Sequence, residues 1–301
     1  MSSWHGSYFL VAHNYFLSFI LLSALFFSPW AAAQKEETSY QLKNVTEDVY
    51  RFTAGNYHAL VVRTSDGVVL VDPLNKEAAK WIKTAVEERF NQEITHLIYS
   101  HSHPDHAYGG DVLNDGNTVF IGHEDTRTNL KRVEADTTLP SLVFNDNFTL
   151  FSGDKEITLS YYGPNNGYGN VAVKVMPDDV MFVVDWVVVG RLPYKDLMGY
   201  DLEGMLNSTE SLLTQPFTHF VGGHANMGDK ADVRAYYGYI KALHDNVLDG
   251  ILAGKTLEQI QKSNPMSAFA SLKMYDEWVD LNIKGAYEQL LSRSYLKLRE
   301  Q

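Results

Sequence analysis

Three histidines and one aspartate lie within six residues of this chain, in the segment HSHPDH at positions 101–106. Neutral imidazole and carboxylate are the ligand types of hydrolytic zinc and iron sites. The preceding segment, residues 94–100, is short, apolar and rich in β-forming residues, which predicts a strand that enters the core. Pro104 and the glycine pair at 109–110 prevent that strand from continuing. This internal position favours a metal site over a polar surface turn or a terminal metal-binding tract.

The HSHPDH segment matches the HxHxDH signature, and from about residue 40 to residue 240 the chain resembles the metallo-β-lactamase-fold metallohydrolase superfamily. The resemblance implies an α/β fold, an αββα sandwich, with metal ligands at the ends of several strands. It also implies a first and a second metal position that share one carboxylate. The implied ligands are His101, His103, Asp185 and the residue at position 166 for the first ion, and Asp105, His106, Asp185 and His224 for the second.

Position 166 departs from the family pattern, which has Gly-x-x-His-x-x-Gly in this loop. The loop here reads GPNNGYGN over residues 163–170, so Asn166 stands where the histidine is expected. No histidine occurs between His123 and His219, which excludes a shifted register. An asparagine amide oxygen is a weaker and harder ligand than imidazole. We therefore expect the first position to hold its ion loosely or to stay empty.

The other implied site residues also follow short strands. Asp185 comes after an apolar run, where an unpaired buried carboxylate would be costly; a metal ion is one partner for it, and capping of a turn is the alternative. His224 follows a predicted strand at 217–221 and a glycine pair. Asp72 matches a family aspartate that supports the metal site without binding the ion, and a turn or helix-capping role is the alternative.

The family pattern implies a metal-bound water or hydroxide that attacks a carbonyl or phosphoryl centre. A divalent ion lowers the pKa of bound water from about 15.7 to about 7 and so makes hydroxide available at neutral pH. Asp105 is the candidate catalytic residue, because besides holding metal it would orient the water or shuttle a proton. Zinc is expected, as one or two ions, and iron or manganese also suits a carboxylate-rich site.

These features predict a metal-dependent hydrolase that acts on an ester, thioester, lactone, lactam or phosphoester. The alternative is a non-hydrolytic metal-binding or ligand-binding protein with a degenerate first site. The formal charge of −12 argues against a nucleic-acid partner and leaves a small-molecule substrate. The chain has no cysteine, which excludes disulfides, thiolate zinc ligands and a cysteine nucleophile.

The N-terminal residues 1–33 contain no Asp, Glu, Lys or Arg. An apolar run at 15–27, a proline at position 29 and three alanines ending at Ala33 predict a signal peptide that is cleaved after Ala33. An uncleaved anchor would need about 20 apolar residues, and the proline interrupts this run. We therefore expect a periplasmic or secreted protein without stable membrane insertion after processing.

The remaining pattern divides into a metallo-β-lactamase-like domain over residues 34–240 and a helical extension over residues 241–301. Strands are predicted near 45–52, 59–62 and 67–72, and an amphipathic helix at 76–90. The polar segment 124–147 is interpreted as a surface helix, with a clamp for substrate charge as the alternative. Helices are predicted at 200–213, 230–248, 257–262 and 267–298. The aromatic residues of the last one pack on the main domain or form a homodimer contact.

Overall fold

The computed structural model describes residues 39–293, 295 and 296. These residues belong to one compact unit. The predicted signal peptide over residues 1–33 lies outside the described residues. None of the helices in the described part of the chain is both long and apolar enough to span a membrane.

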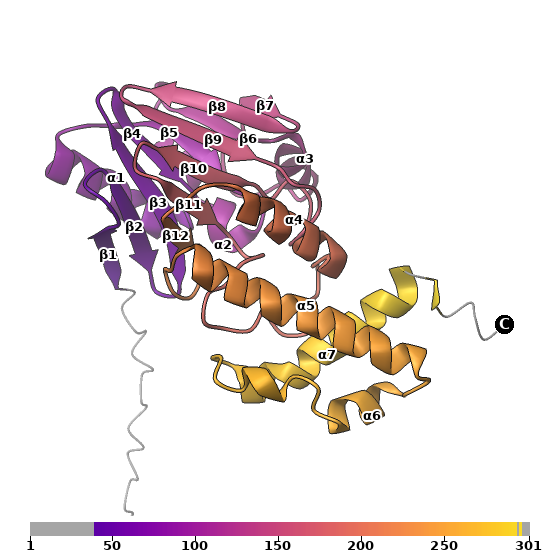
Figure 1. Ribbon diagram of the computed structural model, residues 1–301. Helices are drawn as coiled ribbons and strands as arrows, with labels where there is room; N and C mark the ends of the chain where they lie inside the picture. The colour runs from indigo at the N-terminus through magenta and orange to yellow at the C-terminus, as the bar shows by residue number, and fades with distance from the viewer. Residues whose placement is uncertain (1–38, 294, 297–301) are drawn as a thin grey trace, which may run out of the picture. The chain divides into compact units, whose positions relative to one another are not determined.

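Two sheets, seven and five strands wide within the described residues, pack face to face (Figure 1). The first sheet keeps the order of the chain: β1 (Tyr40–Asn44), β2 (Val49–Ala54), β3 (Tyr57–Thr64), β4 (Gly67–Val71), β5 (Ile94–Tyr99), β6 (Val119–His123) and β7 (Leu142–Phe144). Strands β1 to β4 are antiparallel hairpins, and β4 to β7 run parallel. Because parallel strands need crossover connections, helices lie between them: α1 (Lys76–Phe90), α2 (Pro104–Ala107), η1 (Gly110–Leu113) and α3 (Glu124–Arg132).

The second sheet has the order β12-β11-β10-β9-β8. Its strands are β8 (Asn147–Ser152), β9 (Lys155–Ser160), β10 (Ala172–Met176), β11 (Val180–Val183) and β12 (His219–Gly222). The strands from β8 to β11 are antiparallel, whereas β12 joins β11 in parallel after the crossover helix α4 (Leu202–Thr214). The parallel pairs therefore extend from the middle of the first sheet to its β7 edge, and they lie at one edge of the second sheet.

Alternation along the strands builds three apolar layers, since successive side chains of a strand point to opposite faces. On the outer face of the first sheet, Val61 and Leu97 pack with Ile82 of α1. On its inner face, Leu60 and Ile98 face the second sheet. The outer face of the second sheet packs against α4 and the long helix α5 (Lys230–Leu252). This layering confirms the predicted αββα sandwich.

The long helices begin at side chains that accept hydrogen bonds from the first backbone N–H groups, which have no partner within the helix. The side chain of Asn75 accepts from Ala78 N at the start of α1. Asp201 does the same for α4, and Asp229 forms a capping box with Asp232 at the start of α5. These caps fix where the chain leaves each strand-end loop and enters a helix.

The chain ends in α6 (Leu257–Lys262), the short η2 (Ser267–Phe269) and α7 (Tyr275–Arg293), which lie below the sheets with α5 (Figure 1). The prediction of one helix over 267–298 is wrong, because the chain turns before α7 and Met274 has φ +65°. Helix α7 packs against α5, where the Tyr239 hydroxyl donates a 2.7 Å hydrogen bond to Asn282. The predicted domain boundary after residue 240 falls inside α5.

Two other sequence predictions need correction. The strand predicted at 45–52 begins only at Val49, because residues 45–48 form a turn in which Thr46 Oγ1 accepts from Val49 N. The segment 124–147 is less irregular than expected. It holds α3, which is the surface helix that the polar pattern indicates, and then β7 and the start of β8. Arg127 donates to the carbonyl of Pro140 at 2.9 Å and so serves the local fold.

Candidate metal centre

The predicted ligands converge at one end of the sandwich, where β5, β11 and β12 end. His101 and His103 follow β5, Asp105 and His106 lie in α2, Asp185 follows β11, and His224 follows β12. Their ligand atoms form two groups, each within 4.8 Å: His101, His103 and Asp185 in one, and Asp105, His106 and His224 in the other. Segments far apart in the sequence thus supply one compact centre.

Asp185 lies between the two groups, as expected for a shared carboxylate. Its Oδ2 is 2.8 Å from His103 Nδ1 and 3.1 Å from His101 Nε2. Its Oδ1 is 3.0 Å from His224 Nε2. Asp185 has φ +70°, a left-handed conformation that is uncommon outside glycine and asparagine and marks strain at functional sites. The strand therefore ends in a backbone bend that turns this carboxylate toward both groups.

In the second group, two imidazole nitrogens face each other. His106 Nε2 lies 3.2 Å from His224 Nε2, and Asp105 Oδ2 lies 3.6 Å from the same His224 atom. Asp105 Oδ2 is 3.9 Å from His106 Nε2. The three ligand atoms surround a common point, which is the arrangement that a bound cation needs.

Asp72 lies behind the histidines and contacts the loop that carries them. Its carboxylate accepts hydrogen bonds from Ser100 N at 2.8 Å and from Ser100 Oγ at 2.7 Å. Ser100 Oγ in turn lies 2.8 Å from His101 Nδ1, and Asp72 Oδ2 lies 3.4 Å from His106 Nδ1. With the Nδ1 atoms directed backward, the Nε2 atoms of both histidines face the centre. Such contacts orient metal-binding histidines and fix their tautomers.

Asn166 reaches the same cavity as His103 and Asp185. Its Oδ1 is buried and has no hydrogen-bond partner among the described residues. Nearly all buried polar atoms in folded proteins are paired. A divalent cation would satisfy this oxygen, so the donor set fits a metal, with an amide oxygen in place of one imidazole.

The acids and bases of the centre shift one another's pKa values. Burial alone would raise the pKa of Asp185, but hydrogen bonds from His101, His103 and His224 hold it well below its usual range. Burial is likewise outweighed at Asp105, where His224 lowers the pKa to about 2. Burial would lower the pKa of His224, yet Asp105 and Asp185 raise it to about 9. Both carboxylates are therefore ionised at neutral pH and available to a cation.

The ligands open into a cavity of about 880 Å³. Its wall includes four aromatic side chains, namely Tyr57, Tyr194, Tyr200 and Trp278. Arg191 and Tyr194, in the loop after β11, also line this cavity. So does His58, whose pKa burial lowers to about 4.

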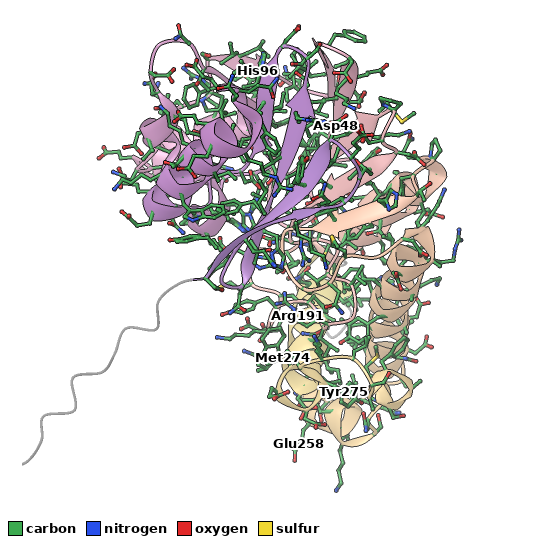
Figure 2. All side chains as sticks on the ribbon, turned by 90° about the vertical axis from the view of Figure 1, so that its left-hand side faces the viewer. Asp48, His96, Arg191, Glu258, Met274 and Tyr275 are labelled. Carbon is green, nitrogen blue, oxygen red and sulfur yellow. The ribbon has the colours of Figure 1, made fainter. Side chains whose placement is uncertain are left out.

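Two further histidines lie away from the metal centre, and one part of the cavity wall was not predicted at all. His96 is at the far end of β5 (Figure 2), and His123 Nε2 donates a hydrogen bond to the Asn145 carbonyl. The contribution of Lys273 and Trp278 to the cavity was missed, because the sequence indicated packing on the main domain or a homodimer contact for the C-terminal aromatic residues. No local motif marks those two residues.

The comparisons with known proteins agree with this geometry. A family model described as the metallo-beta-lactamase superfamily matches residues 52–225, which is more than half of the chain. A structure of a metallo-beta-lactamase from Pontibacter korlensis superposes with a TM-score of 0.61 at 19% identity, and the match covers 67% of this chain and 99% of that one. The alpha subunit of 2,4-dinitroanisole O-demethylase from Nocardioides sp. (strain JS1661) is 25% identical over 233 residues, which is 74% of this chain and 69% of that protein. The chain belongs to the metallo-beta-lactamase superfamily.

Proposed function

We propose that this protein is a metal-dependent hydrolase of ester, thioester, lactone, lactam or phosphoester bonds. The observation that carries the proposal is the pair of ligand groups that share Asp185 at the floor of a large cavity. Zinc is the first choice of ion, and iron or manganese suits the carboxylates as well. Membership of the superfamily supports the fold and the metal centre, and the reaction is our inference from the site.

A bound divalent ion supplies hydroxide at neutral pH by lowering the pKa of coordinated water to about 7. The residues of the chain hold and orient the reactants around it. Asp105 has a side chain that is 36% exposed and ionised, so it accepts a hydrogen bond from a water molecule in the cavity and orients it. The lowered pKa of Asp105 favours orientation of the water over proton transfer.

A second candidate reaction is the removal of a methyl group from an aryl ether. Two observations favour it: the relative whose name is 2,4-dinitroanisole O-demethylase subunit alpha, and the aromatic wall of the cavity. Tyr194 and Trp278 pack edge to face with ring centroids 5.3 Å apart. Aromatic side chains of this kind bind flat aromatic rings by stacking. An aryl ether therefore belongs in any substrate panel.

The test combines metal analysis with a substrate panel. Purified protein is assayed for metal by elemental analysis and for turnover of a chromogenic cephalosporin, a thioester, a lactone, a phosphodiester and 2,4-dinitroanisole, with and without chelator. We expect bound metal and chelator-sensitive turnover of at least one compound, both lost in His106→Ala. The matched control is His96→Ala, since His96 lies outside the cavity.

Three results would contradict the proposal. Turnover that survives both complete removal of metal and His106→Ala excludes a metal mechanism. Metal binding without turnover of any compound favours the non-hydrolytic binding protein. Loss of metal in His96→Ala, at the level seen in His106→Ala, means that the effect is on folding and not on the centre.

A further inference from the structure

The cavity wall carries two cationic side chains besides the metal ligands, Arg191 and Lys273. Their segments are joined through the backbone. Leu192 N donates to Lys273 O at 3.1 Å, and Lys273 N donates to Gly190 O at 3.1 Å. Figure 2 shows Arg191 close to Met274, at the level where the C-terminal helices meet the sheets. The loop after β11 and the segment before α7 thus hold both cations in one fixed place.

Within the described residues, the Arg191 guanidinium forms no ion pair with a carboxylate. It lies over the Trp278 ring, with Cζ 5.3 Å from the ring centroid. Its Nε is buried and has no hydrogen-bond partner among the described residues. The two acids of the cavity, Asp105 and Asp185, form ion pairs with histidines of the metal centre. Arg191 is half-buried, and because a buried polar group without a partner is costly, its unpartnered N–H indicates that an anion from outside completes the guanidinium.

Lys273 adds to the same positive wall. Its side chain is exposed and forms no ion pair within the described part of the chain. The whole protein carries a formal charge of −12, so a cavity wall with two cations that form no ion pair within the described residues differs in sign from the protein as a whole. A concave surface lined by one sign of charge concentrates ligands of the opposite sign.

The surroundings of Arg191 are aromatic. Trp278 stacks against the guanidinium, and Tyr194 packs edge to face on Trp278. Tyr57 packs on His224 at the metal centre, with ring centroids 5.5 Å apart. The cavity therefore runs from the metal ligands along aromatic side chains to the two cations.

We propose that the substrate is an aromatic carboxylate, whose carboxylate binds to Arg191 and Lys273 while its reacting bond reaches the metal centre. This inference rests on the proposed function and specifies its substrate class. A guanidinium presents a planar fork of N–H donors that matches a carboxylate with two parallel hydrogen bonds. The lysine ammonium adds a second charge without fixing a direction. The 880 Å³ cavity is large enough for a substituted ring system.

The first test is equilibrium binding to the full-length purified protein, with naphthalene-2-carboxylate and naphthalene-2-carboxamide as probes. The two probes differ only in charge at one end, and quenching of tryptophan fluorescence reports their binding. We expect the carboxylate to bind at least about tenfold more tightly than the carboxamide. Arg191→Gln should remove most of this preference, and Lys273→Gln a smaller part. The measurement is repeated after chelation, to separate the two cations from any contribution of bound metal.

The matched controls are Arg234→Gln and Lys255→Gln, because both side chains are exposed and lie outside the cavity. Arg191→Gln removes the stack on Trp278, so its melting temperature is measured beside that of the wild type. If Arg191→Gln unfolds, Lys273→Gln still tests the inference, because Lys273 is exposed and its substitution should leave the fold intact. Equal binding of the two probes to the wild type overturns the inference. So does a carboxylate preference that survives both substitutions, or one that the controls remove equally.

The second test adds an aryl ester to the panel, prepared with a carboxylate or a carboxamide on the ring. Arg191→Gln should raise the KM for the carboxylate ester about tenfold relative to the carboxamide ester, because the contact is remote from the bond that breaks. A carboxylate preference in binding without any turnover contradicts the proposed hydrolase alone. Turnover without a carboxylate preference contradicts the present inference alone.

Discussion

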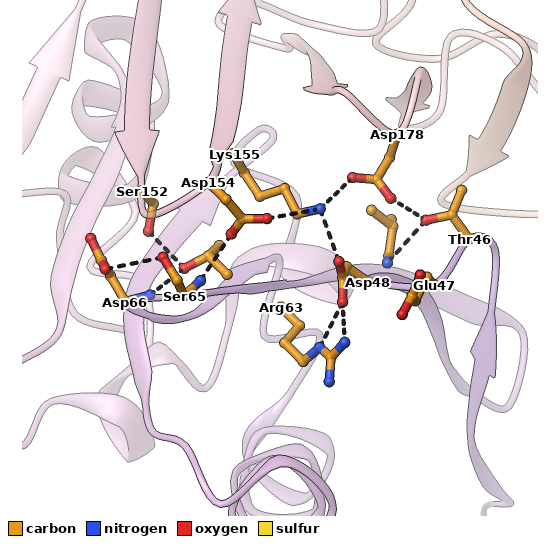
Figure 3. Close-up of polar contacts among 12 residues, drawn as sticks. Thr46, Glu47, Asp48, Arg63, Ser65, Asp66, Ser152, Asp154, Lys155 and Asp178 are labelled. Atoms are coloured by element: carbon orange, nitrogen blue, oxygen red, sulfur yellow. Dashed lines mark hydrogen bonds and ion pairs between the residues drawn. The ribbon is translucent and has the colours of Figure 1, made fainter.

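Buried charge is concentrated at both ends of the sheets, but it is compensated differently at each. At the end opposite the metal centre, Lys155 lies between Asp48 and Asp178, at 3.0 and 2.9 Å (Figure 3). Arg63 donates to Asp48 from the other side. At the metal end, Asp105 and Asp185 contact histidines, and the buried Oδ1 of Asn166 has no hydrogen-bond partner among the described residues.

The difference separates a structural charge cluster from a binding site. The Lys155 side chain is 4% exposed, and its ammonium forms ion pairs with three carboxylates. Asp154 is the most exposed of the three. Protein groups therefore balance the charges of that cluster. At the metal centre, the partners of Asp185 are the histidines that would bind the ion, and no lysine or arginine of the described residues forms an ion pair with it. Both ends of the sheets are rich in charge, but only the metal end keeps a buried polar atom without a protein partner, and so only that end indicates a binding site.

The largest effect is expected from Asp185→Asn. The substitution removes the one charge that both ligand groups share, so the protein should lose metal and its turnover should fall to the rate of the chelated wild type, about a thousandfold or more. Elemental analysis and the panel assay measure both. Asp178→Asn is the mirror control, which should lower stability and leave the metal content unchanged. Full metal content in Asp185→Asn would contradict the assigned position of this carboxylate.

Lys155→Met should have the next largest effect. It removes the cation that Asp48 and Asp178 share, although Asp48 keeps Arg63, and breaking a buried ion pair costs about 3–5 kcal/mol. Urea unfolding of chelated protein gives the difference, with metal content as a second readout that should not change. Lys80→Met, which breaks an exposed pair with Glu77, should stay within about 0.5 kcal/mol. Equal losses in the two variants would mean that the cluster adds no special stability.

Asn166→His should strengthen metal binding at the first position by about tenfold, since imidazole is a better ligand than an amide oxygen for zinc. Titration with zinc against a chromogenic chelator measures the affinity. Asn226→His is the control, because Asn226 lines the cavity but belongs to neither ligand group. If affinity is unchanged in Asn166→His, or rises equally in the control, residue 166 is not a ligand position.

The smallest effect concerns acid stability. Burial alone would raise the pKa of Asp48, but hydrogen bonds from Lys155 and Arg63 outweigh it and hold the pKa below the ordinary value of 3.8. The unfolded chain therefore binds this proton more readily than the folded one. The stabilisation is present in full above the unfolded pKa and is lost as the pH falls through the folded value.

Asp48→Asn measures that contribution. We compare the free energy of unfolding of the chelated wild type with that of chelated Asp48→Asn. The difference should be constant near about pH 6 and should shrink toward about pH 3. Denaturant unfolding at a series of pH values follows it. A difference that grows on acidification would reverse the assigned sign. Asp66→Asn is the comparison variant, as its carboxylate forms only exposed contacts with Ser65 and Gly153.

The sandwich and most of the candidate centre were predictable because their signals are local. The HSHPDH segment, Asp185 and His224 each follow a short apolar strand, and parallel strands that pair side by side bring their ends together. Asp72 and Asn166 followed from the family pattern, and the structure places both at the centre. Their roles as supporting residue and weak ligand stay predictions.

Features that depend on distant segments were not predictable. Lys155 begins an ordinary strand, and only the folded chain shows that Asp48 and Asp178 flank it. The turn before α7 was missed because residues 267–298 keep a helical composition through Met274. Arg191 and Trp278 are 87 positions apart, and neither has a neighbour in sequence that indicates a stack. Such contacts are set by how α7 docks, which no local pattern encodes.

The backbone link between Leu192 and Lys273 has an evolutionary consequence. The proposed metal ligands and the proposed carboxylate-binding residues come from different segments of the chain. The strand ends supply the ligands, and residues after Gly254 supply part of the substrate-binding wall. Changes in the C-terminal segment could therefore alter the substrate range of a related protein while every metal ligand is kept.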